Sequence, residues 1–324
     1  MVPSQISELN VSSVLSNVTS EETETQPNRL SSQYVLFTTI FFAIVAAVGI
    51  PGNSLVLAIV VRLRQTRAPC DLLVANICAA DLALCVIAVP LRIIEVYRGW
   101  ILGEVMCYII APLQDVFVAV SAVTHTAIAM FKYHAVATPF HAKMSEKQMK
   151  TGIAVTWITC YLASGAPITV FLSYEGDTEC RVQFTSASHR TGYILFLVIL
   201  FIVIPLFIEC AAYTGIIYKL RANMVFQPSG LPQSGIHSQR LRQTKRLIKM
   251  LMVMMLAFNV SWIPRGVIMV MEVFTPQRST SPHFTKYLSQ ITLEMFYIKS
   301  VINPFILFSM SGRFRSNCFK EFRN

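Results

Sequence analysis

Polar side chains stand inside long apolar stretches at Asn53, Asp81, Ser121 and Asn303. Such groups must meet protein, water or ions, because lipid offers them no hydrogen bonds. One interpretation is that Asn53 and Asp81 bond each other and only hold two helices together. A buried carboxylate usually has a further role, and Ser121 and Asn303 would complete an oxygen-lined site around Asp81. Oxygen ligands suit a hard cation, so these three residues are predicted to bind sodium.

The stretch at residues 107–133 is apolar but carries a few regularly placed polar side chains. Gln114 and Ser121 lie seven residues apart, so they share one face of a helix. Polar groups at this depth favour a position inside a bundle of helices rather than against lipid. We predict that this stretch is surrounded by the others, with a ligand-binding end near Cys107 and a basic end near Tyr133.

The composition indicates an all-α integral membrane protein. Of the 324 residues, 54% are hydrophobic and 14% are charged, and the mean hydropathy is +0.55. A helix satisfies its own backbone in lipid and needs about 20 residues to cross a bilayer. Seven apolar stretches meet this requirement, at residues 34–62, 70–96, 104–134, 148–172, 190–219, 246–273 and 284–309. They predict a seven-transmembrane helix bundle that forms one domain, residues 34–310.

Lysine and arginine residues concentrate in alternate connections between these spans. The connections after spans one, three and five and the C-terminal tail include Arg62, Arg64, Arg67, Lys143, Lys147, Lys150, Arg240, Arg242, Lys245, Arg246, Arg313 and Arg315. Because basic loops stay in the cytosol, we predict a multi-pass protein of the plasma membrane with its N-terminus outside and its C-terminus in the cytoplasm. The net charge of +10 then comes mainly from these cytosolic basic residues, which can also attract anionic membrane lipids. It does not indicate nucleic acid as a partner.

The two ends of the chain differ from the spans. Residues 1–33 are polar and predict a disordered extracellular tail, glycosylated at Asn10 and Asn17. No signal-peptide pattern precedes residue 34, so the first span is expected to act as the insertion signal. Residues 311–324 predict a short amphipathic helix on the inner membrane surface and a short cytoplasmic tail, because Phe314, Cys318 and Phe322 repeat every four residues opposite cations. Cys318 is a predicted palmitoylation site.

Two of the eight cysteines lie in connections predicted to be outside the cell. Cys107 begins the third span and Cys180 follows the fourth, whereas the other cysteines lie in or beside apolar runs, where a free cysteine behaves as a small hydrophobe. The outer compartment is oxidising. A disulfide between Cys107 and Cys180 is therefore predicted to hold this outer loop over the mouth of the bundle.

The ordered set of motifs on the seven spans resembles a rhodopsin-like (class A) G-protein-coupled receptor over nearly all of residues 34–322. The motifs are Gly52-Asn53 with Val56, Ala80-Asp81-Leu82, Trp100, Cys107, Trp157, Cys180, Pro205 with Tyr213, Phe258 with Trp262 and Pro264, and Asn303-Pro304. The resemblance implies a cell-surface receptor whose outer cavity binds a ligand and whose spans five and six move outward to activate heterotrimeric G proteins. It also implies a sodium site at Asp81 and a switch at Trp262. The residues implied in switching and coupling are Lys132, Tyr133, Tyr213, Phe258, Pro264 and Pro304.

Three departures from the family pattern bear on this mechanism. Phe131-Lys132-Tyr133 stands where the family has Asp-Arg-Tyr, and Lys presents a point charge in place of a rigid fork of donors. Leu307 stands where the family has a Tyr after Asn-Pro. Lys299 lies four residues before Asn303, where a neutral residue is usual. Our hypothesis is that Lys299 reaches Asp81, forms a buried ion pair and displaces sodium.

The predicted ligand is a neuropeptide or another non-amine molecule. Gln114 occupies the position at which monoamine receptors carry an Asp, and Asp115 is rotated from it by about 100°. Pro112-Leu113-Gln114 is similar to peptide receptors of the orexin and neuropeptide Y/FF type. Acidic residues of the outer loop, including Glu179, fit a basic peptide, although they also fit a solvated loop.

Arg265 follows the Pro264 bend and is expected to face the cavity. It either binds a ligand carboxylate or carbonyl, or pairs internally with Asp115 or Glu294. The predicted ligand-binding residues are Gln114, Asp115, Glu179, Trp262, Arg265, Glu294 and Tyr297.

Other classes of protein fit less well. An opsin would need a Lys at position 297, which is Tyr297, two residues from Lys299 and therefore on another face of the helix. The six histidines form no metal pair or nucleophile motif, so no enzyme and no cofactor other than sodium is predicted. The main alternative is a receptor-like protein that binds a ligand or another receptor without activating G proteins.

Overall fold

The computed structural model describes residues 32–63, 69–138, 144–176, 179–225, 235–274 and 282–321. The predicted glycosylation sites Asn10 and Asn17, and Phe322, lie outside the described residues. Helices are α2 (Ser32–Arg62), α3 (Pro69–Ala83), α4 (Val89–Arg98), α5 (Gly103–Ala137), α6 (Glu146–Cys160), α7 (Ala166–Thr169), α8 (Ala187–Val198), α9 (Ile204–Val225), α10 (Gly235–Phe274), α11 (Pro282–Met310) and α12 (Gly312–Glu321).

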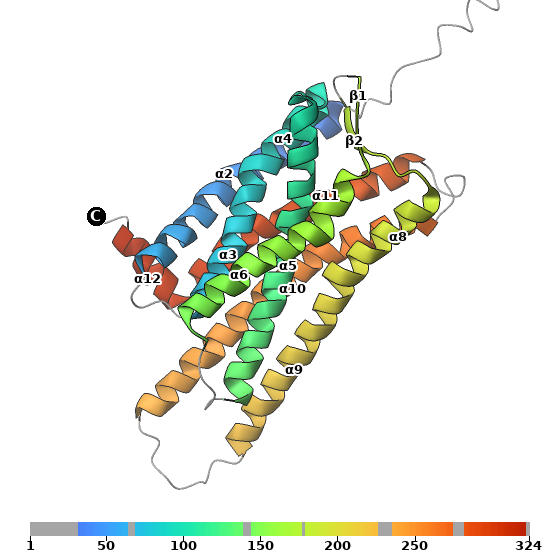
Figure 1. Cartoon of the computed structure of the whole chain (residues 1–324). Coiled ribbons are helices and arrows are strands. Elements are labelled where there is room, and N and C mark those ends of the chain that lie inside the picture. The colour runs from blue at the N-terminus through green and yellow to red at the C-terminus, as the bar shows by residue number, and fades with distance from the viewer. Residues whose placement is uncertain are drawn as a thin grey trace, which may run out of the picture. The chain divides into compact units, whose positions relative to one another are not determined.

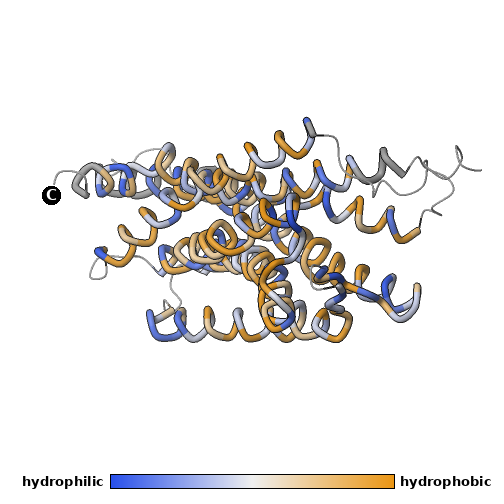
Figure 2. Tube along the Cα trace, turned by 90° about the horizontal axis from the view of Figure 1, so that it is seen from above, coloured by the Kyte–Doolittle hydropathy of each residue, from blue (hydrophilic) through white to orange (hydrophobic). Residues whose placement is uncertain are grey.

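Seven helical segments in the described part of the chain are long and apolar enough to cross a membrane. They cover residues 33–62, 69–98, 103–137, 146–169, 187–222, 242–274 and 287–310. Apolar residues predominate along these segments (Figure 2). The predicted all-α bundle of seven spans with a short helix after the last one is confirmed, and only the ends of the spans differ by a few residues.

Three of the spans contain one turn of π-helix that the sequence did not predict. These turns are η2 (Leu84–Ala88), η3 (Tyr161–Gly165) and η4 (Ile199–Val203). A proline follows each turn at its second residue: Pro90, Pro167 and Pro205. Proline lacks the amide hydrogen of a helix, and its ring clashes with the carbonyl four residues earlier. That carbonyl falls inside the turn in all three spans, so the wider π-turn is the local response to the proline.

Helix α5 is the central element of residues 38–324, which form one compact unit. It contacts α3, α6, α9 and α10. Its middle is buried, with Val120, Ser121 and Ala122 fully inaccessible. The prediction that the third span lies inside the bundle therefore agrees with the structure.

A two-stranded antiparallel hairpin covers one end of the bundle. Strands β1 (Leu172–Glu175) and β2 (Glu179–Val182) pair Leu172 with Val182 and Tyr174 with Cys180. The predicted disulfide between Cys107 and Cys180 is confirmed and attaches β2 to the start of α5. The hairpin and α12 lie at opposite ends of the bundle (Figure 1).

Helix α12 is held against the bundle by one ion pair and one buried ring. The Arg313 guanidinium lies 2.8 Å from the Asp71 carboxylate at the start of α3. Phe314 is buried, and Cys318 packs partly buried against the same apolar cluster. Palmitoylation of Cys318 stays a prediction.

Candidate functional site

A cavity of about 760 Å³ lies beneath the hairpin, between α4, α5, α8, α10 and α11. Five of the predicted ligand-binding residues line it: Gln114, Asp115, Trp262, Arg265 and Tyr297. Its lower wall is apolar and aromatic, whereas charged side chains stand higher on α4, α5, α8 and α10. The arrangement suits a ligand with a buried apolar end and polar groups above it.

Arg92 organises one wall and was missed by the sequence interpretation. Its guanidinium lies 2.9 Å from Glu95 and donates a 3.4 Å hydrogen bond to the Gln114 side chain. Tyr297 lies close enough to interact with it electrostatically. Arg92 could have been found from the sequence, because it is a cation near the outer end of an apolar span. Charged residues in such positions usually bind a ligand or pair with another charge in the protein.

The Asp115 carboxylate faces the cavity without a hydrogen bond or ion pair to any residue in the described part of the chain. Arg92 and Arg265 are near enough to interact with it electrostatically. Arg265 does not form the predicted ion pair with Asp115 or Glu294. It instead donates hydrogen bonds of 2.6 Å to the Ser289 hydroxyl and 3.3 Å to the Ser289 carbonyl, which join α10 to α11.

Two residues predicted to bind ligand lie off the cavity wall. Glu294 points toward α2, where the Thr38 hydroxyl donates a 2.9 Å hydrogen bond to its carboxylate. Glu179 lies on the exposed surface of β2, 2.8 Å from Arg181. Each acid lies on the expected segment but on a face turned away from the cavity, and its role in ligand binding stays a prediction.

Trp262 forms the floor of the cavity. Its ring packs against Phe296 at 4.9 Å between ring centroids. Its buried indole nitrogen has no hydrogen-bond partner among the described residues. Because this nitrogen is inaccessible, a ligand acceptor could reach it only if the indole ring moved.

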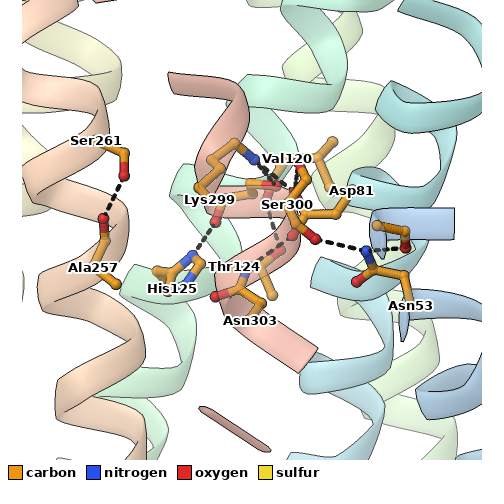
Figure 3. Close-up of polar contacts among 12 residues, drawn as sticks. Asn53, Asp81, Val120, Thr124, His125, Ala257, Ser261, Lys299, Ser300 and Asn303 are labelled. Carbon is orange, nitrogen blue, oxygen red and sulfur yellow. Dashed lines mark hydrogen bonds and ion pairs between the residues drawn. The ribbon is translucent and has the colours of Figure 1, made fainter. Parts of the chain in front are cut away.

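Directly below the floor, a polar cluster joins α3, α5 and α11 (Figure 3). The Lys299 ammonium lies 2.7 Å from Asp81 Oδ1 and donates a 3.2 Å hydrogen bond to the Ser121 hydroxyl. Ser300 donates to Asp81 Oδ1 at 3.2 Å, and Asn303 donates to Asp81 Oδ2 at 2.8 Å. The three residues predicted to form a sodium site are therefore brought together, with the Lys299 ammonium among them as the hypothesis required.

Asn53 belongs to the edge of this cluster but does not bond Asp81. Its amide donates 2.8 Å hydrogen bonds to the backbone carbonyls of Gly49 and Ser300. It thus ties α2 to α11. The interpretation that Asn53 and Asp81 simply hold each other is wrong.

The residues implied in switching and coupling, apart from Pro264 beside the Trp262 floor, run from the cluster toward the end of the bundle that carries α12. Phe258 stacks on His125 at 4.6 Å. Tyr213 is buried between α5 and α10, and a side chain in place of Gly215 would clash with the Tyr133 ring.

Lys132 is 9% exposed, lies 5.5 Å from the Phe131 ring and contacts the Cys70 thiol. No carboxylate of the described residues pairs with Lys132. Leu307, the other departure from the family pattern at this end, is buried among apolar side chains.

A second buried carboxylate, Glu209 on α9, was also missed as a site. Thr126 on α5 donates a 3.1 Å hydrogen bond to it, and Asn259 on α10 donates one of 2.8 Å. Glu209 is 1% exposed. It therefore links three helices at membrane depth, and an acid within an apolar span was the sequence signal that pointed to it.

Replacing Glu209 with Leu will lower the melting temperature of the purified protein. The substitution removes the acceptor that the Asn259 amide and the Thr126 hydroxyl share and leaves them only the Met255 and Ala122 carbonyls of their own helices, at a cost of about 1 kcal/mol. Glu209→Gln keeps one acceptor oxygen and the shape, so it will lose less stability and serves as the matched control. Equal melting temperatures for Glu209→Leu and the parent protein would contradict this role.

The bundle, the disulfide-anchored hairpin and the cavity above a Trp floor define a seven-span membrane receptor. A family model described as "7 transmembrane receptor (rhodopsin family)" matches residues 52–307. The chain therefore belongs to the rhodopsin family of seven-transmembrane receptors. Its place is the plasma membrane, as a multi-pass protein, and the resemblance drawn from the motifs is confirmed.

Several curated relatives are receptors named for peptides or hormones. The chain is 25% identical over 291 residues to a QRFP-like peptide receptor of Branchiostoma floridae, covering 86% of this chain and 76% of the relative. It is 28% identical over 290 residues to growth hormone secretagogue receptor type 1 of Oryctolagus cuniculus, covering 84% and 77%. It is 25% identical over 306 residues to the substance-K receptor of Mus musculus, covering 90% and 76%.

Proposed function

We propose that the chain is a receptor for an extracellular peptide and that it activates heterotrimeric G proteins when the inner ends of α9 and α10 move outward. The observation that carries this proposal is the cavity, whose charged upper walls and aromatic floor come from five helices and meet at Trp262. The peptide-receptor names of the relatives support the same ligand class. A peptide offers both the side-chain charges and the apolar groups that such walls can bind.

The cavity is proposed to open outside the cell, with the N-terminal tail on the same side and α12 in the cytoplasm. The Cys107–Cys180 disulfide at the mouth of the cavity supports this orientation, because disulfides persist in oxidising compartments. The alternation of basic connections supports it independently.

A small amine is disfavoured as the ligand by the wall around Gln114. The Arg92 guanidinium occupies the space beside the Gln114 side chain, so a protonated amine at this position would meet a like charge. Opsin chemistry is disfavoured by Lys299, whose ammonium is directed to Asp81 below the floor. Asp115 on the α5 wall is the acid that can receive a basic group of a peptide, which would compete with Arg92 and Arg265 for the carboxylate.

Replacing Asp115 with Asn is expected to weaken activation by the cognate peptide about 30-fold or more, because one partner of a desolvated charge pair is lost. The measurement is peptide potency on cells that express the full chain, with surface expression matched. Glu179→Gln, which removes an acid outside the cavity, is the control and should leave potency unchanged. A ligand whose potency ignores Asp115→Asn would show that Asp115 is not the contact.

The function itself is tested by screening pools of amidated peptides on cells that express the chain with a promiscuous G protein. A peptide that signals through this chain and not through mock-transfected cells supports the proposal. A complete lack of response to a peptide shown to bind would contradict G-protein activation.

A receptor-like protein that binds ligand without activating G proteins is the second candidate. It is favoured by Lys132, which is buried, has no carboxylate partner among the described residues and lacks the donor fork of Arg. The signalling assay on Lys132→Arg separates the two. If a bound peptide activates neither form, the non-signalling function is supported.

A further inference from the structure

We propose that Lys299 permanently takes the place of the sodium ion that membership of this family implies at Asp81, so that sodium does not bind there or change the stability of this receptor. The proposal concerns the interior of the bundle and is independent of which ligand the cavity binds. It rests on the position of one ammonium group and on the hydrogen bonds around one carboxylate.

The Asp81 carboxylate is already occupied by donors of the protein. Its Oδ1 atom lies 2.7 Å from the Lys299 ammonium and accepts a 3.2 Å hydrogen bond from Ser300, while its Oδ2 atom accepts a 2.8 Å hydrogen bond from Asn303. The side chains of Asp81 and Lys299 are 0% and 1% exposed. Both carboxylate oxygens therefore already face donors, and the charge is neutralised within the protein.

A metal cation fits poorly beside Asp81. Sodium would need several oxygen ligands at this point, but Ser121 already accepts from Lys299, and Asn303 turns its amide nitrogen, not its oxygen, toward Asp81. A sodium ion beside the carboxylate would also stand within a few ångströms of a positive ammonium group. Two like charges in a buried site repel strongly, because no water screens them. The residues present do not fit a bound sodium ion.

Two aromatic rings also hold the Lys299 ammonium. Its nitrogen lies 5.1 Å from the centroid of Phe296 and 5.6 Å from that of Phe258, distances at which a cation is attracted to a ring face. Phe296 is also the ring that packs against Trp262. The cation is thus carried by α11 and held by oxygen atoms and by two aromatic rings, one of which, Phe296, lines the cavity.

A free ion and a tethered ammonium respond differently to the surroundings. A sodium ion stabilises the state that binds it by an amount that depends on its concentration, whereas a covalently attached cation has no such dependence. Lys299 also cannot leave when the helices move. Its charge must follow α11 or find a new partner within the bundle.

The test is the melting temperature of the purified full-length receptor in equal concentrations of sodium chloride and potassium chloride. The wild type is expected to melt at the same temperature in both salts. Lys299→Asn removes the ammonium and leaves Asp81 with free oxygens, so sodium should raise its melting temperature by about 3 °C relative to potassium. Lys299→Asn combined with Asp81→Asn is the matched control, in which the difference between the salts should vanish.

A wild-type protein that melts higher in sodium than in potassium would overturn the proposal without any variant being needed. A folded Lys299→Asn protein with the same melting temperature in sodium chloride and potassium chloride would also overturn it. If Lys299→Asn does not yield folded protein, Lys299→Ser provides the same comparison. These measurements use no peptide, so their failure leaves the proposed function standing, and failure of the peptide screen leaves this proposal standing.

Discussion

Replacing Asp81 with Asn will destabilise the receptor by about 3–5 kcal/mol, the largest effect expected of a single substitution here. The change leaves the Lys299 ammonium buried without its counter-ion, and Lys299 is 1% exposed, so water cannot compensate. A buried charge without a partner is far more costly than the loss of the attraction itself. The measurement is thermal or denaturant unfolding of the purified protein, in which Asp81→Asn should melt well below the parent.

A double substitution distinguishes loss of the pair from loss of packing. Lys299→Met combined with Asp81→Asn removes both charges and keeps similar side-chain volumes, so most of the stability lost by Asp81→Asn should return. If the double variant is as unstable as the sum of the two single variants, the ion pair is not the cause of the destabilisation. That result would indicate independent packing defects at the two positions.

Replacing Cys180 with Ser will give the second large effect, a loss of roughly 2–4 kcal/mol together with reduced binding of any ligand that touches the hairpin. The disulfide joins residues 73 apart in the sequence, so removing it frees a long loop in the unfolded chain. It also releases β2, which carries Cys180 and Val182 onto the cavity wall. Melting temperature and surface expression are the measurements.

Cys210→Ala is the control for the disulfide variant, because Cys210 is an exposed free cysteine on α9. It should change neither quantity appreciably. If Cys180→Ser proved as stable as Cys210→Ala, the hairpin would have to be held by its other contacts alone, such as the 3.3 Å hydrogen bond from Tyr108 to the Leu172 carbonyl.

Long-range features were predictable where the sequence contained a physical conflict. A carboxylate at position 81 and an ammonium at position 299 cannot each remain alone in an apolar bundle, so their pairing followed from the cost of burial. The disulfide was predictable because both of its cysteines lie in connections expected on the oxidising side of the membrane. The spans were predictable from their length and hydropathy.

Side-chain direction was much less predictable than position along the chain. Glu294 and Arg265 were assigned to the correct outer ends of their helices, yet Glu294 bonds Thr38 and Arg265 bonds Ser289. The rotation of one helix against its neighbour decides such contacts, and no residue pattern within a single span records it. The exposed position of Glu179 agrees with the solvated-loop alternative, and the register of the hairpin, which sets this exposure, could not be known from composition.

The three prolines that follow π-turns set the orientation of the outer halves of their spans. Each turn contains one more residue than an α-helical turn, and one residue corresponds to about 100° of rotation. Arg92 lies beyond η2 and Tyr193 lies on the outer side of η4, both on the cavity wall. Deleting a single residue from η2 would swing Arg92 about a quarter of a circle away from Gln114, so the geometry of the ligand site is encoded by helix defects half-way through the membrane.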